Sequence, residues 1–583
     1  MLQLNKDKLL SQLATALIIT LVLAPCLLAL LFIAKYGVNC LFIDQWAMVP
    51  LFDKLYSGKL LFGDLFIQAW EHRPLLPRVV MLALGSLTHY NNLAEMYFSW
   101  FLLCLTCLVL FKLFVRLFGL SRTTLVKFIP VSWLVFSLRQ YENLLRGDQL
   151  AIFLEILLFL LTVYLLALSR RFDWRFLLAI VCAVACTFSL AGGLLVWPVA
   201  LVQILCSNSV PGKRLWRLDI VKAAVWTCVG VAIYILYFDG YWRPAASPDP
   251  FYFMMDPYAA SAFGIVVMGS PLSLDVKGAL AVGGLILLLY IFIIGVAMFR
   301  PKMLTAKFPA LSLVLFTVSV AIVLVVTRSG WGIERAFISW YTTMTTLGII
   351  GLYTLVISLD FKNSRVKYMM TGCLIALIFA GVGPTADPVY LVIGNRVCGD
   401  RQTLAYYLAT YKYKSDEIII KYLSPSPEQV RQLSEKLEKN KLNVFSDATL
   451  SSNRLKPLTT EPTYHLDTID DKLIQSEQIL MIEANKEKTL RLTGWAIDSI
   501  GKAEAGGVLI SVDGQIVIPA FCGLSRPDVA KYFNNDNYTL CGFEALLDTA
   551  MIGPGQHDLS IKVIAADGKA FYQPVKFLTM EIK

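Results

Sequence analysis

The residues best suited to chemistry lie in one polar stretch near the start of the chain, between two apolar segments. Residues 40–78 read CLFIDQWAMVPLFDKLYSGKLLFGDLFIQAWEHRPLLPR and place Asp44 and Trp46, a predicted substrate-binding residue, shortly after the first apolar segment. A carboxylate close to lipid is costly unless it faces water or a partner. Removing a proton from a sugar hydroxyl would explain the position of Asp44. The alternative is that Asp44 caps the helix predicted over 45–56.

The tripeptide Glu71-His72-Arg73 immediately precedes Pro74, where a helix is predicted to begin. The free backbone N–H groups of a helix start, together with an arginine, make a place for a phosphate. In the alternative interpretation, Glu71 only complements the helix dipole and Arg73 extends to the membrane interface. The sequence fits His72 to hydrogen bonding as readily as to metal binding.

A second polar segment, RQYENLLRGDQ at residues 139–149, contributes further candidates. Either Arg139 or Arg146 is predicted to contact an anionic ligand. The alternative is that Glu142 and Arg146, four residues apart, pair on one helical face. Two amides of the same segment are predicted to contact hydroxyl groups: Asn143 and Gln149.

A third segment, RSGWGIERAFISWY at residues 328–341, adds Arg328 and Arg335. Arg328 alone would also be typical of an interfacial anchor. However, an excess of arginine on a non-cytoplasmic face runs against the usual charge bias, which favours a specific anionic partner. The aromatic and proline-rich residues 240–276 are predicted to form a loop that acts as a gate or a sugar-stacking surface, or that packs at the membrane interface.

The composition identifies what must position these side chains. Hydrophobic residues make up 57% of the 583-residue chain, and the mean hydropathy is +0.63, values typical of an integral membrane protein. The net charge of +10 does not indicate a nucleic-acid partner, because the basic residues lie in small clusters between apolar segments. Most of the twelve cysteines lie within apolar segments, and no soluble segment has a CxxC pair, so a metal site is not predicted.

Eleven membrane spans are predicted, and the first is too long for a signal peptide. Residues 75–88 are apolar but short and bounded by proline, so they are predicted to form a helix on the membrane surface. The predicted spans are 11–34, 91–111, 124–138, 150–168, 176–191, 194–206, 223–239, 277–299, 308–326, 343–358 and 368–384.

Loop charge predicts the orientation, because six basic clusters fall on one side under this count and that side is then cytoplasmic. The N-terminus is therefore expected in the cytoplasm and everything after Thr385 outside it. The clusters are Lys6 and Lys8; Lys112, Arg116, Arg122 and Lys127; Arg170, Arg171 and Arg175; Lys213, Arg214, Arg217 and Lys222; Arg300, Lys302 and Lys307; and Lys362, Arg365 and Lys367.

Three domains are predicted: a transmembrane catalytic domain at 1–398 with surface helices at about 45–88, a helical stalk and linker at 399–475, and an outer β-sandwich at 476–583. The stalk is predicted to be helical over 401–422, followed by a helix capped by Ser426 with Val430, Leu433 and Leu437 on one face. From Ile479 onward the periodicity becomes two, typical of short strands. Cys522 and Cys541 either form a disulfide or are two buried thiols.

The chain resembles the GT-C superfamily of polytopic membrane glycosyltransferases, which use sugars linked to polyprenyl phosphate. The resemblance covers roughly residues 1–400. It is carried by the acidic residue in a long first outer loop (IDQW), by the surface helix after that loop, and by the segments ENLLRGDQ, SLAGGLLVWP and RSGWGIERAFISWYTT. The last three are similar to patterns in bacterial members that modify surface polysaccharides. The β-sandwich resembles small accessory domains of bacterial carbohydrate-active proteins.

The resemblance implies a bacterial inner-membrane enzyme that modifies O-antigen or lipopolysaccharide, with a polyprenyl-phosphate sugar as donor and a glycan or lipid-linked acceptor. A separate donor synthase and a flippase would supply the donor. The resemblance assigns the base to Asp44. Many members have a second acidic residue beside the first, but Gln45 stands here, so Glu71 is the partner or the second acid is missing. The leaving phosphate would be neutralised by Arg73 and by one of Arg146, Arg328 and Arg335, with no metal or other cofactor required.

Three other functions are compatible with parts of the sequence. A transporter or flippase for lipid-linked glycans would also collect arginines, but usually in a central cavity between repeated halves, and no repeat is evident. A polysaccharide polymerase would use diphosphate-linked donors. A non-catalytic anchor for the sandwich would not need eleven spans.

Overall fold

The computed structural model describes residues 2–169, 172–206, 215–299, 307–359, 364–382, 387–446, 455–470, 472–473, 480–482, 489–549 and 552–582. The chain divides into two compact units. The first comprises Met1–Gly37, Leu60–Leu84 and Leu93–Gly394, and the second comprises Val38–Lys59, Gly85–Asn92 and Asn395–Lys583. Several predictions lie outside the described residues: the boundary between 475 and 476, Arg170, Arg171, Lys213, Arg214, Arg300, Lys302, Lys362 and Thr385.

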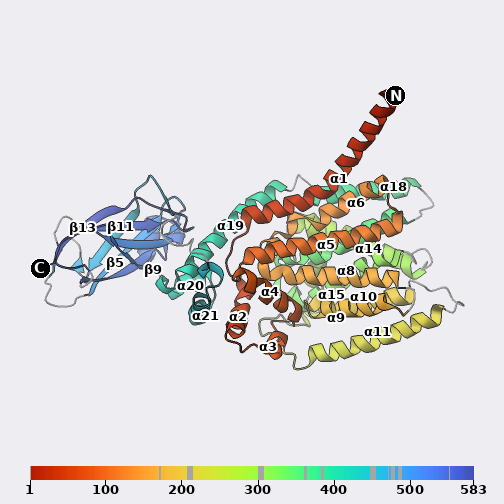
Figure 1. The fold of residues 1–583 in the computed structure, drawn as a ribbon, viewed down its shortest axis with the longest axis horizontal. Coiled ribbons are helices and arrows are strands. Elements are labelled where there is room, and N and C mark those ends of the chain that lie inside the picture. The colour runs from red at the N-terminus through yellow and green to blue at the C-terminus, as the bar shows by residue number, and fades with distance from the viewer. Residues whose placement is uncertain are drawn as a thin grey trace. The chain divides into compact units, whose positions relative to one another are not determined.

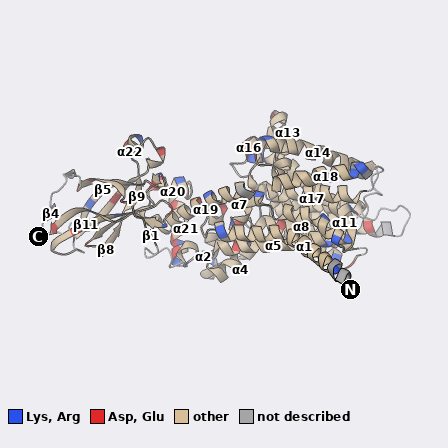
Figure 2. Ribbon diagram, turned by 90° about the horizontal axis from the view of Figure 1, so that it is seen from above, with Lys and Arg blue, Asp and Glu red and all other residues tan. Residues whose placement is uncertain are grey.

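The first unit is helical, and its long helices lie side by side (Figure 1). Lysines and arginines gather near helix ends, and most of the helical ribbon carries neither sign of charge (Figure 2). The longer helices are α1 (Leu2–Tyr36), α4 (Leu75–Thr88), α5 (Asn92–Phe118), α6 (Arg122–Val135), α8 (Leu150–Leu168), α9 (Trp174–Thr187), α10 (Val196–Cys206), α11 (Leu215–Phe238), α13 (Pro257–Gly269), α14 (Val276–Phe299), α15 (Phe308–Arg328), α17 (Thr342–Ser358), α18 (Ser364–Val382) and α19 (Asp387–Ala409). The last turn of α4 from Gly85, Asn92 of α5 and the part of α19 from Asn395 belong to the second unit.

Each of the eleven predicted spans overlaps a helix within the described residues, which confirms a multi-pass membrane protein. Within the described residues, seven helices are long and apolar enough to cross a membrane: Lys8–Tyr36, Asn92–Phe118, Gly147–Leu168, Asp219–Phe238, Val276–Val296, Phe308–Trp331 and Ile333–Ser358. The other four predicted spans fall on the shorter helices α6, α9, α10 and α18. Their crossing of the membrane stays a prediction, as does the cytoplasmic side.

Helix α13 corrects the prediction that residues 240–276 form a loop. Asp256 caps the helix by accepting a 2.9 Å hydrogen bond from the backbone N–H of Ala259, and Pro257 occupies the first turn. The helix packs closely on α14, because a Cβ atom on Gly283 would lie only 1.9 Å from the Ile265 carbonyl oxygen. The aromatic and proline-rich beginning of this segment concealed the apolar helix that follows it.

The second unit contains a predicted helix that the structure confirms, α21 (Pro427–Lys439). The Ser426 hydroxyl caps it, and its three predicted apolar positions are buried. Segment 38–59 joins this unit through η1 (Ile43–Met48) and α2 (Val49–Tyr56). The buried side chain of Asn443 links segment 38–59 to the rest of the second unit by donating to the side-chain oxygens of Asn39 (2.8 Å) and Asn92 (3.0 Å).

The C-terminal β-sandwich is confirmed, with two sheets whose inner faces share one apolar core. In one sheet, β5 (Thr489–Asp498) pairs antiparallel with β10 (Gly542–Asp548), and in the other β11 (Gly555–Ile564) pairs antiparallel with β7 (Gly507–Val512) and β13 (Val575–Ile582). Buried residues recur at every second position over residues 490–496 of β5 and 559–563 of β11, as the period of two predicts. The remaining strands are β1 (Lys456–Pro457), β2 (Thr463–Ile469), β3 (Lys472–Leu473), β4 (Leu480–Ile482), β6 (Ala503–Glu504), β8 (Ile516–Pro519), β9 (Phe521–Leu524) and β12 (Ala570–Phe571).

Two predictions in this unit were wrong. The supposed linker contributes strand β2, which pairs antiparallel with β5, because Tyr464, Leu466 and Ile469 face the sandwich core despite the polar residues between them. The stalk is not one helix over 401–422, since α19 ends at Ala409 and α20 (Asp416–Tyr422) starts anew.

The break in the stalk has a local cause at Ser415. Its backbone N–H donates to the carbonyl oxygen of Cys522, and its hydroxyl donates to that of Gly523, so the residue is bound to strand β9. The same hydroxyl accepts from the backbone N–H of Ile418 and caps α20. Cys522 and Cys541 are both buried free thiols, which decides between the two alternatives left by the sequence.

Candidate active site

An ion pair between Glu71 and Arg328 forms the centre of the candidate site in the first unit. The Arg328 guanidinium lies 2.8 Å from Glu71 Oε1, and the Ser247 hydroxyl donates to the same oxygen at 3.2 Å. The two charged side chains keep 16% and 19% of their surface exposed, so both are accessible. Arg328 also stacks on the Trp331 ring at 4.4 Å. Residues predicted from segments more than 250 positions apart are therefore in direct contact.

Arg328 has guanidinium N–H donors that no described group of the protein uses. Among the described residues, Glu71 is its one ion-pair partner, and no other hydrogen bond from its guanidinium is formed to the protein. The planar guanidinium has five N–H donors, which suit the oxygens of a phosphate. Arg328 is therefore the predicted arginine whose geometry best fits anion binding.

Arg73 uses its guanidinium differently. Its Nε donates to the carbonyl oxygen of Tyr237 at 2.7 Å, and its terminal nitrogens donate to the carbonyl oxygens of Asp239 and Phe66. The side chain is 7% exposed and stacks on Phe66 at 5.0 Å. It therefore satisfies carbonyls at the C-terminal end of α11, where a cation is favourable. Phosphate binding by Arg73 stays a prediction, and the structure gives it this positioning role.

His72 is held as a neutral hydrogen-bond donor. Its Nδ1 accepts from the backbone N–H of Ala191 at 3.2 Å, so in the neutral ring the proton is on Nε2. Burial lowers the pKa of His72 to about 4, with the neighbouring Arg328 acting in the same direction and Glu71 opposing it. At neutral pH the ring therefore has one N–H to offer and no positive charge.

The loop that carries these residues is tightly held. Ala69 and His72 exchange two backbone hydrogen bonds, of 2.8 and 2.9 Å. The Gln68 amide donates to the carbonyl oxygen of Trp242 and accepts from its backbone N–H. Between them, Trp70 has a φ of +52°, an unusual conformation for a bulky side chain. Strain of this kind, directly before Glu71, is common at functional sites.

The same feature occurs before Asp44, which lies in the second unit with Trp46. Ile43 has a φ of +49°, a conformation that β-branched residues rarely adopt, and it directly precedes Asp44 in the first turn of η1. Asp44 is exposed, whereas Trp46 is 8% exposed and its indole N–H has no hydrogen-bond partner among the described residues. The catalytic role of Asp44 and the binding role of Trp46 stay predictions.

The candidates from residues 139–149 are mostly bound to protein groups. Arg146 contacts both carboxylate oxygens of Asp148 and stacks on the Trp340 ring at 5.0 Å. Gln149 donates to the same carboxylate at 3.1 Å. The buried Asn143 donates to Thr343 at 2.8 Å. These contacts fix the ends of α8 and α17, and ligand binding by the three predicted residues stays a prediction.

Arg335 differs from these residues in being exposed. It lies in the short helix α16 (Ile333–Ala336) and forms no ion pair with any described residue. Its exposure leaves it available to a ligand, and anion binding by Arg335 stays a prediction.

Glu155 is a candidate that the sequence interpretation missed. It lies in α8 with none of its side chain exposed, and neither carboxylate oxygen has a hydrogen-bond partner among the described residues. Its Oε1 would lie 2.5 Å from a Cβ atom on Gly192, next to Ala191, whose N–H binds His72. The signal in the sequence was an acidic residue inside an otherwise apolar span, which is rare and usually functional.

Comparison with known proteins matches no family model and no curated protein. Among solved structures, the crystal structure of ArnT from Cupriavidus metallidurans bound to undecaprenyl phosphate matches with a TM-score of 0.36 and 13% sequence identity. This match covers 92% of this chain and 99% of that chain.

Proposed function

We propose that this protein is a membrane glycosyltransferase that moves a sugar from a polyprenyl-phosphate donor to a hydroxyl of a glycan or lipid-linked acceptor. The observation that carries the proposal is the cluster of Glu71, His72 and Arg328. An accessible arginine with unused donors, a neutral imidazole N–H and a carboxylate meet in a protein with many membrane helices. Such a set suits a substrate that combines a phosphate, a sugar and a lipid tail.

The proposed reaction is a displacement at the anomeric carbon of the donor sugar. The acceptor hydroxyl gives its proton to a carboxylate base, and its oxygen forms a bond to the anomeric carbon. The bond between that carbon and the phosphate oxygen breaks, and the electron pair leaves with the polyprenyl phosphate. Arg328 and the His72 Nε2–H stabilise the charge that develops on the departing phosphate. Glu71 holds the Arg328 guanidinium in place.

Asp44 stays the predicted base on the sequence resemblance to GT-C enzymes, and the strained Ile43 precedes it in the chain. The proposed location is the bacterial inner membrane, with the reaction at its outer face and surface polysaccharide as the acceptor. A reporter fused after Lys583 would test the orientation. Fluorescence or enzyme activity of that reporter in the cytoplasm would exclude it.

Release of free polyprenyl phosphate tests the reaction directly. Membranes containing the full-length protein are given a radiolabelled polyprenyl-phosphate hexose, and the lipid products are separated. A transferase releases polyprenyl phosphate, a polymerase that uses diphosphate-linked donors releases the diphosphate, and a transporter releases neither. The last two results would contradict the proposal.

Variants then test the individual roles at matched protein levels. Arg328→Gln is expected to lower the transfer rate by about 10²–10³, the usual effect of losing one donor to a developing negative charge. Asp44→Asn is expected to lower it by about 10²–10⁴ as a lost general base. Arg396→Gln and Asp400→Asn, at exposed positions outside the cluster, should retain the wild-type rate. Near-normal transfer by Asp44→Asn would remove that residue from the role.

A further inference from the structure

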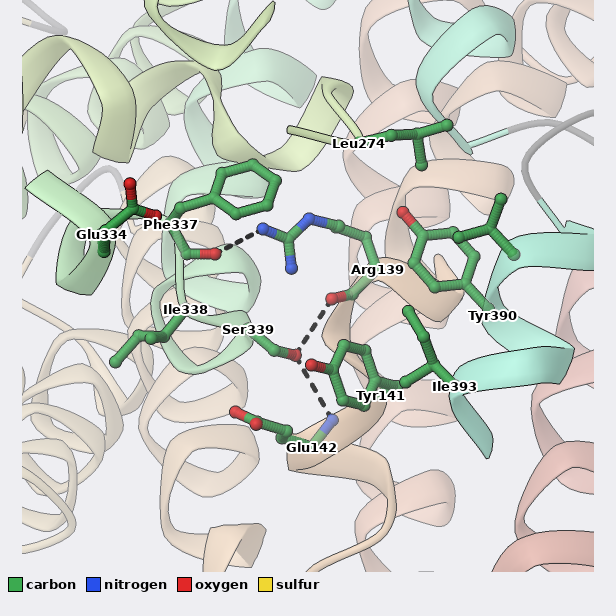
Figure 3. Close-up of a pocket in the computed structure, with 11 residues that line it drawn as sticks. Arg139, Tyr141, Glu142, Leu274, Glu334, Phe337, Ile338, Ser339, Tyr390 and Ile393 are labelled. Atoms are coloured by element: carbon green, nitrogen blue, oxygen red, sulfur yellow. Dashed lines mark hydrogen bonds between the residues drawn. The ribbon is translucent and has the colours of Figure 1, made fainter. Parts of the chain in front are cut away.

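The first unit also contains a cavity whose lining residues differ from those of the Glu71 cluster. Its volume is about 220 Å³, and it is lined by Arg139, Tyr141, Glu142, Leu274, Glu334, Phe337, Ile338, Ser339, Val389, Tyr390 and Ile393 (Figure 3). Four separated segments of the chain therefore meet around one space.

The wall of the cavity is built around Arg139. Its Nε donates to the carbonyl oxygen of Ser270 at 3.1 Å, its Nη2 donates to that of Phe337 at 2.5 Å, and the guanidinium stacks on the Phe337 ring at 4.1 Å. The Ser339 hydroxyl donates to the Arg139 carbonyl oxygen at 2.9 Å. The positive charge is thus directed to backbone carbonyls, which makes Arg139 a rigid wall residue rather than an anion-binding one.

Besides Arg139, the residues that line the cavity include two acidic and three aromatic ones. The acidic residues are Glu142 and Glu334, and the aromatic residues are Tyr141, Phe337 and Tyr390 (Figure 3). Carboxylates accept hydrogen bonds from hydroxyl groups, and aromatic faces cover the apolar C–H faces of a sugar ring. Two carboxylates disfavour a phosphate or another anion.

The size of the cavity limits the occupant further. A volume of 220 Å³ equals roughly the liquid volume of seven water molecules, at about 30 Å³ each. This space fits one pyranose ring but not a polyprenyl chain. We propose that the cavity formed by Arg139, Glu142, Glu334 and Tyr390 binds a single uncharged sugar ring.

The position of the cavity along the chain connects it with the cluster described above. Segment 328–341 begins at Arg328, which pairs with Glu71, and continues to Glu334, Phe337 and Ser339 of the cavity wall. A sugar bound there would be carried on the same segment as the phosphate-binding arginine. Its assignment as the acceptor ring rests on the proposed function, whereas the binding of a sugar does not.

Direct binding tests the proposal without any transfer reaction. Full-length protein in detergent is examined by saturation-transfer NMR with methyl α-glucoside, methyl α-mannoside and methyl α-galactoside. At least one glycoside is expected to receive saturation from the wild-type protein. Glu334→Gln is expected to weaken its binding by about 10-fold or more, since a hydrogen bond to a charged group is lost. Glu417→Gln, at an exposed position outside the cavity, should bind like the wild type.

Two outcomes would overturn the proposal. The first is that no glycoside receives saturation, or that wild type and Glu334→Gln bind equally. The second is that ethanolamine receives saturation and no glycoside does, which would make the cavity an amine site. Arg328→Gln separates the two proposals, because it should bind the glycoside normally while losing transfer. A protein that binds glycoside but releases no polyprenyl phosphate would refute the transferase alone.

Discussion

The contact between Glu155 and Gly192 predicts the outcome of a double-mutant cycle. A Cβ atom added at Gly192 would lie 2.5 Å from Glu155 Oε1, well inside the normal contact distance. The carboxylate cannot move into solvent, because the Glu155 side chain is completely buried. We therefore expect Gly192→Ala to force the turn away from α8 and to disturb the Ala191 N–H that binds His72.

The size of the effect follows from the extra methyl group. Inserting one methyl into a packed interior typically costs about 1–3 kcal/mol. In a Glu155→Ala background the obstructing carboxylate is absent, so the same Gly192→Ala change should cost less by about that amount. Glu155→Gln is the matched control, since it keeps the shape of the side chain and should leave the full cost of Gly192→Ala in place.

Thermal unfolding of the wild type and the five variants in detergent, together with polyprenyl-phosphate release, provides the measurement. Gly192→Ala is expected to lower the thermal stability strongly in the wild-type and Glu155→Gln backgrounds and only slightly in the Glu155→Ala background. If Gly192→Ala costs the same in all three, Glu155 does not lie against this turn and the reasoning fails.

Three further predictions concern stability and reactivity. The pKa of His72 is about 4 in the folded protein, below the ordinary value of 6.5, so the unfolded chain binds the proton first. The free energy of unfolding should therefore fall by up to about 3 kcal/mol as the pH drops from 7 to 4. His72→Gln should reduce this loss in acid unfolding curves, and an unchanged pH dependence in that variant would contradict the role of His72. Arg73→Lys should lower the free energy of unfolding by about 1.5–3 kcal/mol, because an ammonium cannot reach all the carbonyls that the guanidinium binds, and an unchanged melting temperature would contradict this. Burial raises the pKa of Cys522, and that of Cys541 to about 12, so neither thiol should react with a maleimide at pH 8 until the protein is unfolded, as mass spectrometry would show.

Much of the architecture follows from local sequence patterns. Each long apolar segment became a helix, because only a helix satisfies the backbone hydrogen bonds of such a segment in lipid. The alternation in TLRLTGWAID and GVLISV produced the strands of the sandwich, and Ser426 capped its helix. These features depend on neighbours along the chain, which the sequence contains directly.

The misjudged elements are those that depend on distant partners. Strand β2 looks like a polar linker until β5 supplies its hydrogen bonds and the sandwich core covers Leu466. The stalk breaks where Ser415 meets strand β9, more than 100 residues later in the chain. No local pattern contains these contacts.

The candidate site divides in the same way. The sequence alone selected Glu71, His72 and Arg328, because charged and polar residues next to membrane spans are costly and need a reason. Only the tertiary structure decided that Arg328 pairs with Glu71, that Arg73 binds backbone carbonyls, and that Glu155 lies buried against Gly192. The physical reason is that the type of a residue fixes which bonds it can form, whereas folding decides which groups come within reach and which donors remain for a substrate.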